Sequence, residues 1–222
     1  MIKKNFLKRT ITSLVLISIL FSMFISSMMM IIAVIIISSL SFYEFNRLFF
    51  NIFKNIFLRF LSSGLILLYL LSFVFIIFYI ESDNSLNPNY KLFFLYSVII
   101  SIASDLGGYF FGKLLKGKKL TKISPNKTIS GVIGALIFSI LIIPIFYTDL
   151  NFKSSNLLFV TTILISLVSQ LGDLFISFLK RLAKVKDTGN ILPGHGGILD
   201  RVDGILFAAP VGLLLLDYLS VI

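Results

Sequence analysis

The chain has 222 residues, of which 57% are hydrophobic and only 14% are charged, and its mean hydropathy is +1.01. A soluble domain carries roughly 25% charged residues, whereas repeated apolar runs of about 20 residues are typical of helices that cross a bilayer. The absence of cysteine excludes disulfides, zinc–thiolate sites and cysteine nucleophiles. We therefore expect an integral membrane protein, and we interpret the net charge of +10 as a topological signal rather than as a sign of nucleic-acid binding.

The N-terminal part is expected to contain three spans. A basic N-terminus precedes an apolar run from Ile11 to Leu40, and no small-residue cleavage site follows, so we interpret the run as an uncleaved anchor. Basic residues also follow the run, at Arg47, Lys54 and Arg59. Because the positive-inside rule places both basic segments on the cytoplasmic side, the run should form a hairpin that turns near Ser26–Ser27. A third span is expected over Ser62–Ile80, before an acidic outer loop.

Four more spans are expected in the remainder of the chain: Lys91–Gly112, Ser130–Tyr147, Asn156–Leu179 and Gly204–Ile222. This topology places all but Lys91 and Lys153 of the 20 Lys and Arg residues on the inner side. The expected fold class is an all-α polytopic bundle of about seven transmembrane helices with its polar site at the cytoplasmic face. We expect one transmembrane domain over residues 1–222, with N-terminal spans in 1–100, a catalytic region in 101–204 and a last span in 205–222.

Two of these spans carry a polar face. One face of the Asn156–Leu179 segment and its extension holds Ser166, Ser169, Gln170, Asp173, Ser177, Lys180 and Lys184. One face of the Lys91–Gly112 segment holds Ser97, Ser101, Ser104, Asp105 and Gly108. Because a carboxylate at the centre of a spanning helix costs about 2.5–3.5 kcal/mol, Asp105 and Asp173 are candidates for function near the inner face. The alternative is that the serines hold helices together and each aspartate pairs with a lysine.

Two inner loops have compositions that suit phosphate groups. Lysines alternate with Ser, Thr and Pro over Lys119–Thr128, which favours phosphate binding or, alternatively, contact with anionic lipid headgroups. The loop Lys180–Gly204 contains glycines whose N–H groups can approach an anion closely. If the next helix has begun there, its carboxylates Asp200 and Asp203 lie one helical turn apart and could share a metal with Asp173. The pattern favours Mg²⁺-dependent chemistry on phosphates over a turn-rich connector with incidental ion pairs.

The same segments resemble the signature of the CDP-diacylglycerol synthases (phosphatidate cytidylyltransferases). The resemblance is carried by Ser177, Lys180-Arg181, Lys186-Asp187, Leu192–Gly197, Leu199–Asp203, Gly172–Leu174, Ser124–Thr128 and Asp105 with Gly108–Gly112. Ser130 stands where the family usually has an acidic residue, and Ile176 stands where it usually has Glu. The chain is also short for the family, chiefly in its N-terminal half.

The resemblance implies an enzyme that joins CTP and phosphatidate into CDP-diacylglycerol and pyrophosphate, with Mg²⁺ as cofactor and a second cation left open. Asp173 and Asp200 would bind the metal, supported by Asp203 and Asp105. The implied catalytic set also includes Lys180, Arg181, Lys186, Asp187 and His195. The implied nucleotide-binding set is Ser124, Lys127, Thr128, Gly194, Gly196, Gly197 and Arg201. The implied partners are CTP, phosphatidate, membrane lipids and a second copy of the chain, in a bacterial inner membrane with the site on its cytoplasmic side.

Two other functions stay open at this point. A CTP-dependent polyprenol or lipid kinase would use similar inner loops, but it would not leave cytidine on the lipid. An ion-coupled transporter would also place aspartates inside its spans, although its sites would lie nearer the middle of the membrane.

Overall fold

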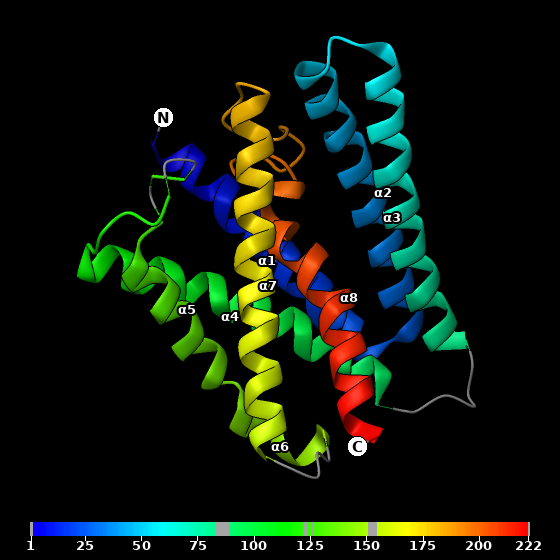
Figure 1. The fold of residues 1–222 in the computed structure, drawn as a ribbon, viewed down its shortest axis with the longest axis vertical. Helices are drawn as coiled ribbons and strands as arrows, with labels where there is room; N and C mark the ends of the chain where they lie inside the picture. Colours follow the sequence, from blue (N-terminus) through cyan, green and yellow to red (C-terminus); the bar gives the residue numbers. More distant parts are fainter. Residues whose placement is uncertain (1, 83–88, 122–123, 126, 151–154, 222) are drawn as a thin grey trace. The chain divides into compact units, whose positions relative to one another are not determined.

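The computed structural model describes residues 2–82, 89–121, 124–125, 127–150 and 155–221. Within these ranges the chain forms eight helices and only isolated β-bridges, which confirms the all-α prediction (Figure 1). The helices are α1 (Ile2–Ile25), α2 (Ser27–Ile52), α3 (Ile56–Ser82), α4 (Tyr90–Leu115), α5 (Ile129–Ile140), α6 (Ile143–Leu150), α7 (Ser155–Leu182) and α8 (Leu199–Val221). Most of the expected outer loop after α3, together with Lys122, Asn126 and Lys153, lies outside the described residues.

The helix boundaries agree with most of the expected spans. The predicted hairpin turn is confirmed, because α1 ends at Ile25 and Ser26 caps α2 by accepting a hydrogen bond from the Met29 amide. In the described ranges five helices are long and apolar enough to cross a bilayer, or six if α5 and α6 form one span. The predicted span Ser130–Tyr147 is a bent pair, since α5 and α6 meet at 41°. The last expected span coincides with α8, which is not among these six, so the count of seven stays a prediction.

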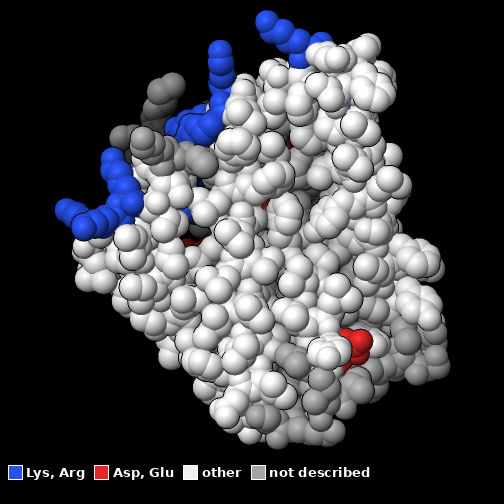
Figure 2. All heavy atoms as spheres, viewed as in Figure 1, with Lys and Arg blue, Asp and Glu red and all other residues white. Residues whose placement is uncertain are grey.

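The chain divides into two compact units, each built from two separate stretches of sequence. Unit 1 comprises Met1–Asn84 and Leu179–Val202, and unit 2 comprises Ser85–Phe178 and Asp203–Ile222. The exposed surface carries many large apolar side chains, among them Phe21, Leu65 and Phe75. The face in Figure 2 is correspondingly almost uncharged, with Lys and Arg side chains projecting at few places. Such a surface is suited to lipid rather than to water.

Unit 1 is built on α1, α2 and α3, and α2 and α3 run side by side in opposite directions (Figure 1). The buried apolar side chains of α2 include Met30 and Phe45, and those of α3 include Phe73 and Ile77. The remaining described segment of unit 1 is residues 179–202. It contains the end of α7, the loop of residues 183–198, here called the polar loop, and the first turn of α8.

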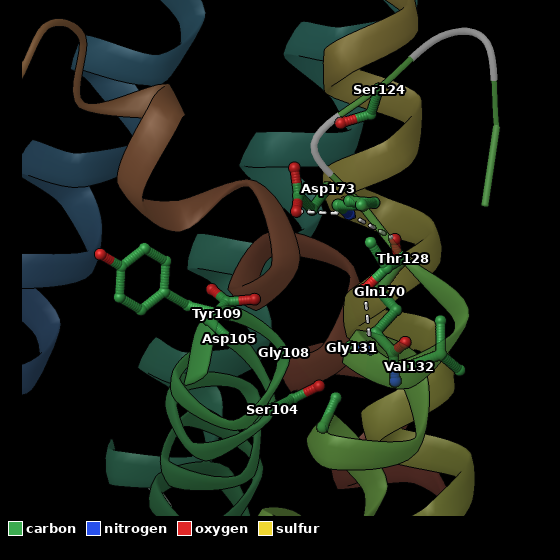
Figure 3. A pocket seen from close by; sticks show the side chains of 12 residues that line it. Ser104, Asp105, Gly108, Tyr109, Ser124, Thr128, Gly131, Val132, Gln170 and Asp173 are labelled. Atoms are coloured by element: carbon green, nitrogen blue, oxygen red, sulfur yellow. Dashed lines mark hydrogen bonds and ion pairs between the residues drawn. The ribbon is translucent and has the colours of Figure 1, made fainter. Parts of the chain in front are cut away.

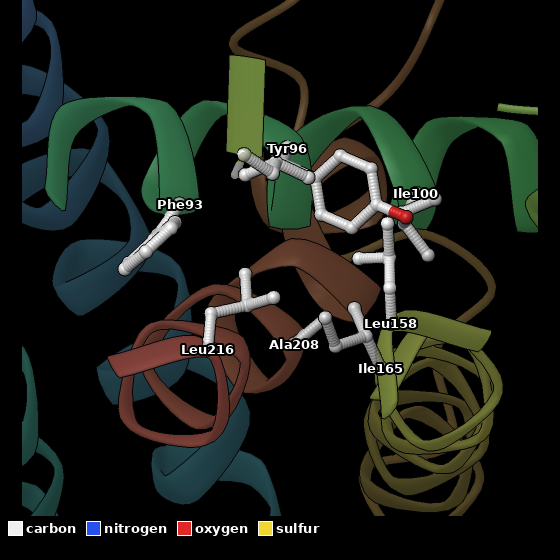
Figure 4. Packing of buried hydrophobic residues seen from close by; sticks show 8 residues of the cluster. Phe93, Tyr96, Ile100, Leu158, Ile165, Ala208 and Leu216 are labelled. Atoms are coloured by element: carbon white, nitrogen blue, oxygen red, sulfur yellow. The ribbon is translucent and has the colours of Figure 1, made fainter. Parts of the chain in front are cut away.

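Unit 2 has a core to which four helices contribute (Figure 4). The fully buried members are Phe93, Tyr96 and Ile100 of α4, Leu150 of α6, Leu158 and Ile165 of α7, and Ala208 and Leu216 of α8. Hydroxyl pairs join α4 to α7, with Ser101 Oγ 2.6 Å from Ser169 Oγ and Ser166 Oγ donating to Ser104 Oγ at 3.0 Å. These serines therefore hold helices together, which was the alternative considered for the polar faces.

The α4 and α5 helices approach closely at glycines. A Cβ on Gly107 would collide with the Gly134 carbonyl, and a Cβ on Gly131 would lie 2.9 Å from the Gly108 carbonyl oxygen. Small residues allow two backbones in a membrane to come into van der Waals contact. This close approach fixes the start of α5 beside α4, and the start of α5 carries the Lys119–Thr128 loop.

Candidate functional site

A pocket of about 310 Å³, with charged and hydroxyl side chains in its lining, lies inside unit 2 (Figure 3). It is lined by Ser104, Asp105, Gly108 and Tyr109 of α4, by Ser124, Lys127, Thr128, Gly131, Val132 and Ala135 of the loop and α5, and by Gln170 and Asp173 of α7. In Figure 3 the ring of Tyr109 extends away from the other labelled side chains. Five of the residues predicted for the site, Asp105, Ser124, Lys127, Thr128 and Asp173, are therefore brought together in one cavity.

Backbone hydrogen bonds position Lys127 at this pocket. The Leu120 amide donates to the Lys127 carbonyl at 2.8 Å, and the Ile129 amide donates to the Lys118 carbonyl at 3.0 Å, which closes a short antiparallel turn. Thr128 then caps α5, because its Oγ1 accepts from the Gly131 amide at 3.1 Å. These hydrogen bonds fix the backbone of Lys127 directly before a capped helix. The position of its side chain therefore depends on the backbone as well as on its ion pair.

Lys127 and Asp173 form an ion pair across the pocket. The Lys127 Nζ also donates to the Gln170 carbonyl at 3.5 Å, and the Ser177 hydroxyl donates to Asp173 Oδ1 at 3.3 Å. The two side chains of the pair are 24% and 25% exposed, so each can exchange its partner for a ligand that enters from solvent. The pairing of an intramembrane aspartate with a lysine is confirmed for Asp173, and it leaves both charges available at the pocket wall.

The oxygen atoms in the lining of this pocket fit a hard cation that is bound together with phosphate. Carboxylate oxygens of Asp105 and Asp173 and hydroxyls of Ser124 and Thr128 are the oxygen ligands that Mg²⁺ accepts. Mg²⁺ is usually held by one or two protein carboxylates, with substrate phosphates and water completing its coordination. Within the described residues of either unit no group of three or more carboxylates or histidines gathers. The two carboxylates and two hydroxyls of the pocket therefore fit such a cation chemically, and the Mg²⁺ itself stays a prediction.

Asp200 orders the polar loop of unit 1. Lys180 Nζ donates to its Oδ1 at 2.7 Å, while its Oδ2 accepts from the Thr188 amide at 2.9 Å, the Thr188 hydroxyl at 3.0 Å and the Gly197 amide at 3.1 Å. Burial alone would raise the pKa of Asp200, but these hydrogen bonds and the Lys180 charge outweigh it and hold the pKa below its ordinary value. The contacts of Asp200 join three parts of the loop, and its role as a metal ligand stays a prediction.

A tight turn presents His195 and its neighbouring glycines. Leu192 and Gly196 pair across it, with the Leu192 amide donating to the Gly196 carbonyl at 2.9 Å. The φ angles of Gly194 (82°) and Gly196 (89°) lie in the left-handed region, where a side chain would be strained. Helix α1 also holds the turn: Arg9 Nε donates to the Gly194 carbonyl at 3.0 Å, and the Thr12 hydroxyl contacts His195 Nδ1. The sequence had indicated only a membrane anchor for this helix.

Glu44 is a buried carboxylate that the sequence did not single out. It lies in α2, its side chain is completely buried, and its carboxyl oxygens accept hydrogen bonds from the Thr188 hydroxyl at 2.7 Å, the Ile198 amide at 3.1 Å and the Leu199 amide at 2.9 Å. Leu199 begins α8 and Ile198 directly precedes it, so Glu44 caps that helix from another element. The available signal was that Glu44 is the single acidic residue before Glu81.

The remaining predicted residues are distributed over the two units. Four of them are exposed in unit 1: Arg181 at the end of α7, Lys186 and Asp187 in the polar loop, and Arg201 at the start of α8. Arg201 Nη2 donates to the His195 carbonyl at 2.9 Å. Asp203 is buried in unit 2, where its Oδ1 accepts from the Gly204 amide at 2.9 Å. Ile176, at a position where the family usually has Glu, is fully buried, and the Ser130 hydroxyl accepts from the Gly117 amide at 3.3 Å. The metal shared by Asp173 and Asp200 stays a prediction.

We expect the docking of the His195 turn to weaken in acid. Partial burial and the positive charges of Arg201 and Arg9 lower the pKa of His195 from its ordinary value of 6.5. Because the undocked imidazole binds a proton more readily, stability is unaffected above that value and falls as the pH drops below it. The protection of the amides of residues 192–197 against hydrogen exchange, corrected for the intrinsic exchange rate at each pH, should therefore fall from pH 7 to pH 5 in the wild type. It should not fall in His195→Gln. An equal response in both would contradict this.

Comparison with known proteins shows that the chain is similar to cytidylyltransferases. The sequence profile of the Cytidylyltransferase family matches residues 49–219. A phosphatidate cytidylyltransferase of Staphylococcus haemolyticus is 46% identical over 140 residues, which cover 62% of this chain and 52% of that protein. A phosphatidate cytidylyltransferase of Staphylococcus aureus is 50% identical over 123 residues, which cover 54% of this chain and 46% of that protein. One of Bacillus subtilis is 41% identical over 145 residues, which cover 64% of this chain and 54% of that protein. The chain thus spans about half the length of the curated relatives it matches.

Proposed function

Because the chain belongs to the cytidylyltransferase family, we propose that it transfers the cytidylyl group of CTP to phosphatidate, forming CDP-diacylglycerol and pyrophosphate. The names of the relatives support this substrate pair. The observation that carries the proposal is the pocket of unit 2, in which a lysine and two aspartates meet hydroxyl groups at the end of spanning helices. Such a pocket suits two phosphate-bearing substrates, one of them dissolved in the bilayer.

The reaction needs positioning and charge neutralisation rather than a nucleophile of the protein. An oxygen of the phosphatidate phosphate attacks the α-phosphorus of CTP, and the bond between that phosphorus and the bridging oxygen breaks, so that pyrophosphate leaves with the electron pair. Groups that hold the two anions in line and oppose their charge supply most of the acceleration in phosphoryl transfer. The absence of cysteine from the chain agrees with this mechanism.

The pocket residues have separable roles in this proposal. Lys127 leaves its ion pair with Asp173 and donates to a phosphate oxygen, while the Ser124 and Thr128 hydroxyls donate to neighbouring oxygens. Asp173, released from Lys127, and Asp105 would hold Mg²⁺. When bound, the metal would neutralise charge on the triphosphate. In the empty pocket Lys127 and Asp173 neutralise each other, and an exchange of these partners would let the pocket accept an anion and a cation together.

The polar loop of unit 1 is proposed to contribute cations and backbone donors to the same reaction. Arg181, Lys186 and Arg201 are exposed, and the left-handed glycines at 194 and 196 turn the backbone sharply. We further propose that the site faces the cytoplasm of a bacterial inner membrane, where CTP is available, and that the protein acts as a homodimer. Cross-linking of the purified protein in membranes tests the dimer.

Two radiolabels separate the proposal from its main alternative. Purified membranes containing the chain are given phosphatidate and CTP that carries tritium in the cytidine or ³²P in the γ-phosphate. A cytidylyltransferase places tritium in the lipid fraction and ³²P in pyrophosphate. Transfer of ³²P to lipid without tritium would instead identify a CTP-dependent kinase.

A further inference from the structure

A second cavity, of about 530 Å³, lies between α2 and α3 in unit 1. It is lined by Phe42, Asn46 and Phe50 of α2 and by Arg59, Phe60, Ser63, Gly64 and Leu67 of α3. None of these residues belongs to the pocket of unit 2 or to the polar loop. Its walls are mainly aromatic and aliphatic, and Arg59 is the single charged residue among them, so the cavity is an apolar groove with one fixed cation.

Arg59 is held in place but incompletely paired. Its Nη2 donates to the Phe53 carbonyl at 3.1 Å, and its guanidinium lies 4.1 Å from the centroid of the Phe50 ring. Its Nε is buried and has no hydrogen-bond partner among the described residues. A buried donor without an acceptor is rare, because its desolvation is not offset. The missing acceptor is expected to be a group that enters the groove.

The chemistry of the missing partner follows from the walls and the position of the groove. A guanidinium matches phosphate oxygens with two parallel donors, which makes arginine suited to phosphate recognition. Phe50 and Phe60, which flank the groove, are 63% and 72% exposed on a helix pair that is apolar enough to cross the bilayer. The groove is therefore reached from the lipid phase, and a soluble phosphate would leave its apolar walls unused.

We propose that this groove binds an anionic glycerophospholipid of the surrounding bilayer, with its headgroup phosphate on Arg59 and its glycerol and first acyl carbons against Phe42 and Leu67. The groove is open beside Gly64, because a Cβ at this position would meet no atom within 4 Å, so a larger side chain there would occupy part of the groove. The proposal rests on the groove and not on cytidylyl transfer, so it stands or falls independently of the reaction proposed above.

Lipid retention by the purified full chain tests the proposal. The protein is equilibrated in detergent with equal amounts of phosphatidylglycerol, phosphatidate and phosphatidylcholine, and the retained lipid is measured by native mass spectrometry. Arg59→Gln should lower retention of both anionic lipids about tenfold, as expected for the loss of a charge-assisted contact, and should leave phosphatidylcholine unchanged. Lys54→Gln, which removes an exposed charge from the adjoining turn, is the matched control and should retain lipid like the wild type.

Gly64→Leu provides a second test that leaves the charge of Arg59 in place. The open space beside Gly64 accommodates the side chain, and leucine favours a helix more than glycine does, so this variant should fold with an undiminished thermal midpoint. It should nevertheless lose anionic lipid as Arg59→Gln does. Unchanged retention in Gly64→Leu and Arg59→Gln, an equal loss in Lys54→Gln, or displacement of the lipid by soluble glycerol 3-phosphate would overturn the proposal.

Discussion

Replacing Asp173 by asparagine is expected to lower CTP-dependent formation of CDP-diacylglycerol by about 10²–10³-fold, the size of effect seen when one preorganised electrostatic contact to a reacting group is removed. Asparagine keeps the shape of the side chain but loses the negative charge that pairs with Lys127. It also loses a ligand proposed for Mg²⁺. Because the pair is partly exposed rather than deeply buried, the protein should remain folded in the membrane.

The control for this experiment is Asp149→Asn. Asp149 is an exposed residue of α6, outside the lining of the pocket, and the substitution is chemically identical. It should change the rate by less than about twofold, as is usual for surface substitutions away from a site. Initial rates should be measured with both variants at equal amounts of folded protein and over a range of Mg²⁺ concentrations. A rate for Asp173→Asn that equals the wild type at every concentration would remove Asp173 from the mechanism.

Replacing Glu44 by glutamine is expected to release the polar loop of unit 1. The Glu44 oxygens accept from two backbone amides and one hydroxyl, and glutamine offers one acceptor oxygen in place of two. At least one donor is then buried without a partner, at a cost of about 1–3 kcal/mol. We expect faster hydrogen exchange at Ile198 and Leu199, a thermal midpoint lower by roughly 2–10 °C, and a loss of cytidylyl transfer.

Glu81→Gln is the matched control, because Glu81 is the other glutamate of the chain and lies at the end of α3. It should leave the exchange of the loop unchanged. A Glu44→Ala variant, which removes the acceptors altogether, should be affected at least as strongly as Glu44→Gln. If both Glu44 variants keep wild-type protection at residues 188–199, the capping role assigned to Glu44 is wrong.

The sequence was sufficient to predict most of the spans, because hydropathy and charge are properties of short segments. Basic residues on both sides of the Ile11–Leu40 run required a hairpin, and Ser26 is the cap at its turn. The bend between α5 and α6 was not predicted, since the whole Ser130–Tyr147 segment has the hydropathy of one span. The count of spans depends on α8, which carries Asp200 in its first turn and Asp203 just after it.

The parts of the candidate site that could be predicted are those whose signal, helical periodicity or loop composition, lies within one short stretch of the chain. Asp173 and the Lys119–Thr128 loop were recognised this way, and the structure brings Asp173 and Lys127 into one pocket. The contacts of Glu44 and Arg9 could not be predicted in this way. Glu44 contacts Ile198, 154 residues away in sequence, and Arg9 contacts Gly194, 185 residues away. Single polar residues in an apolar helix carry no period, so only the tertiary contacts identify what they do.

The chain should consume CTP by transferring its cytidylyl group to phosphatidate. The most direct test is the stoichiometry of products formed by the purified chain in vesicles that contain phosphatidate. We predict equal amounts of CDP-diacylglycerol and pyrophosphate, formed only with Mg²⁺ and lost in Asp173→Asn. Consumption of CTP with CDP as the nucleotide product, or no CTP consumption by folded protein, would contradict cytidylyl transfer.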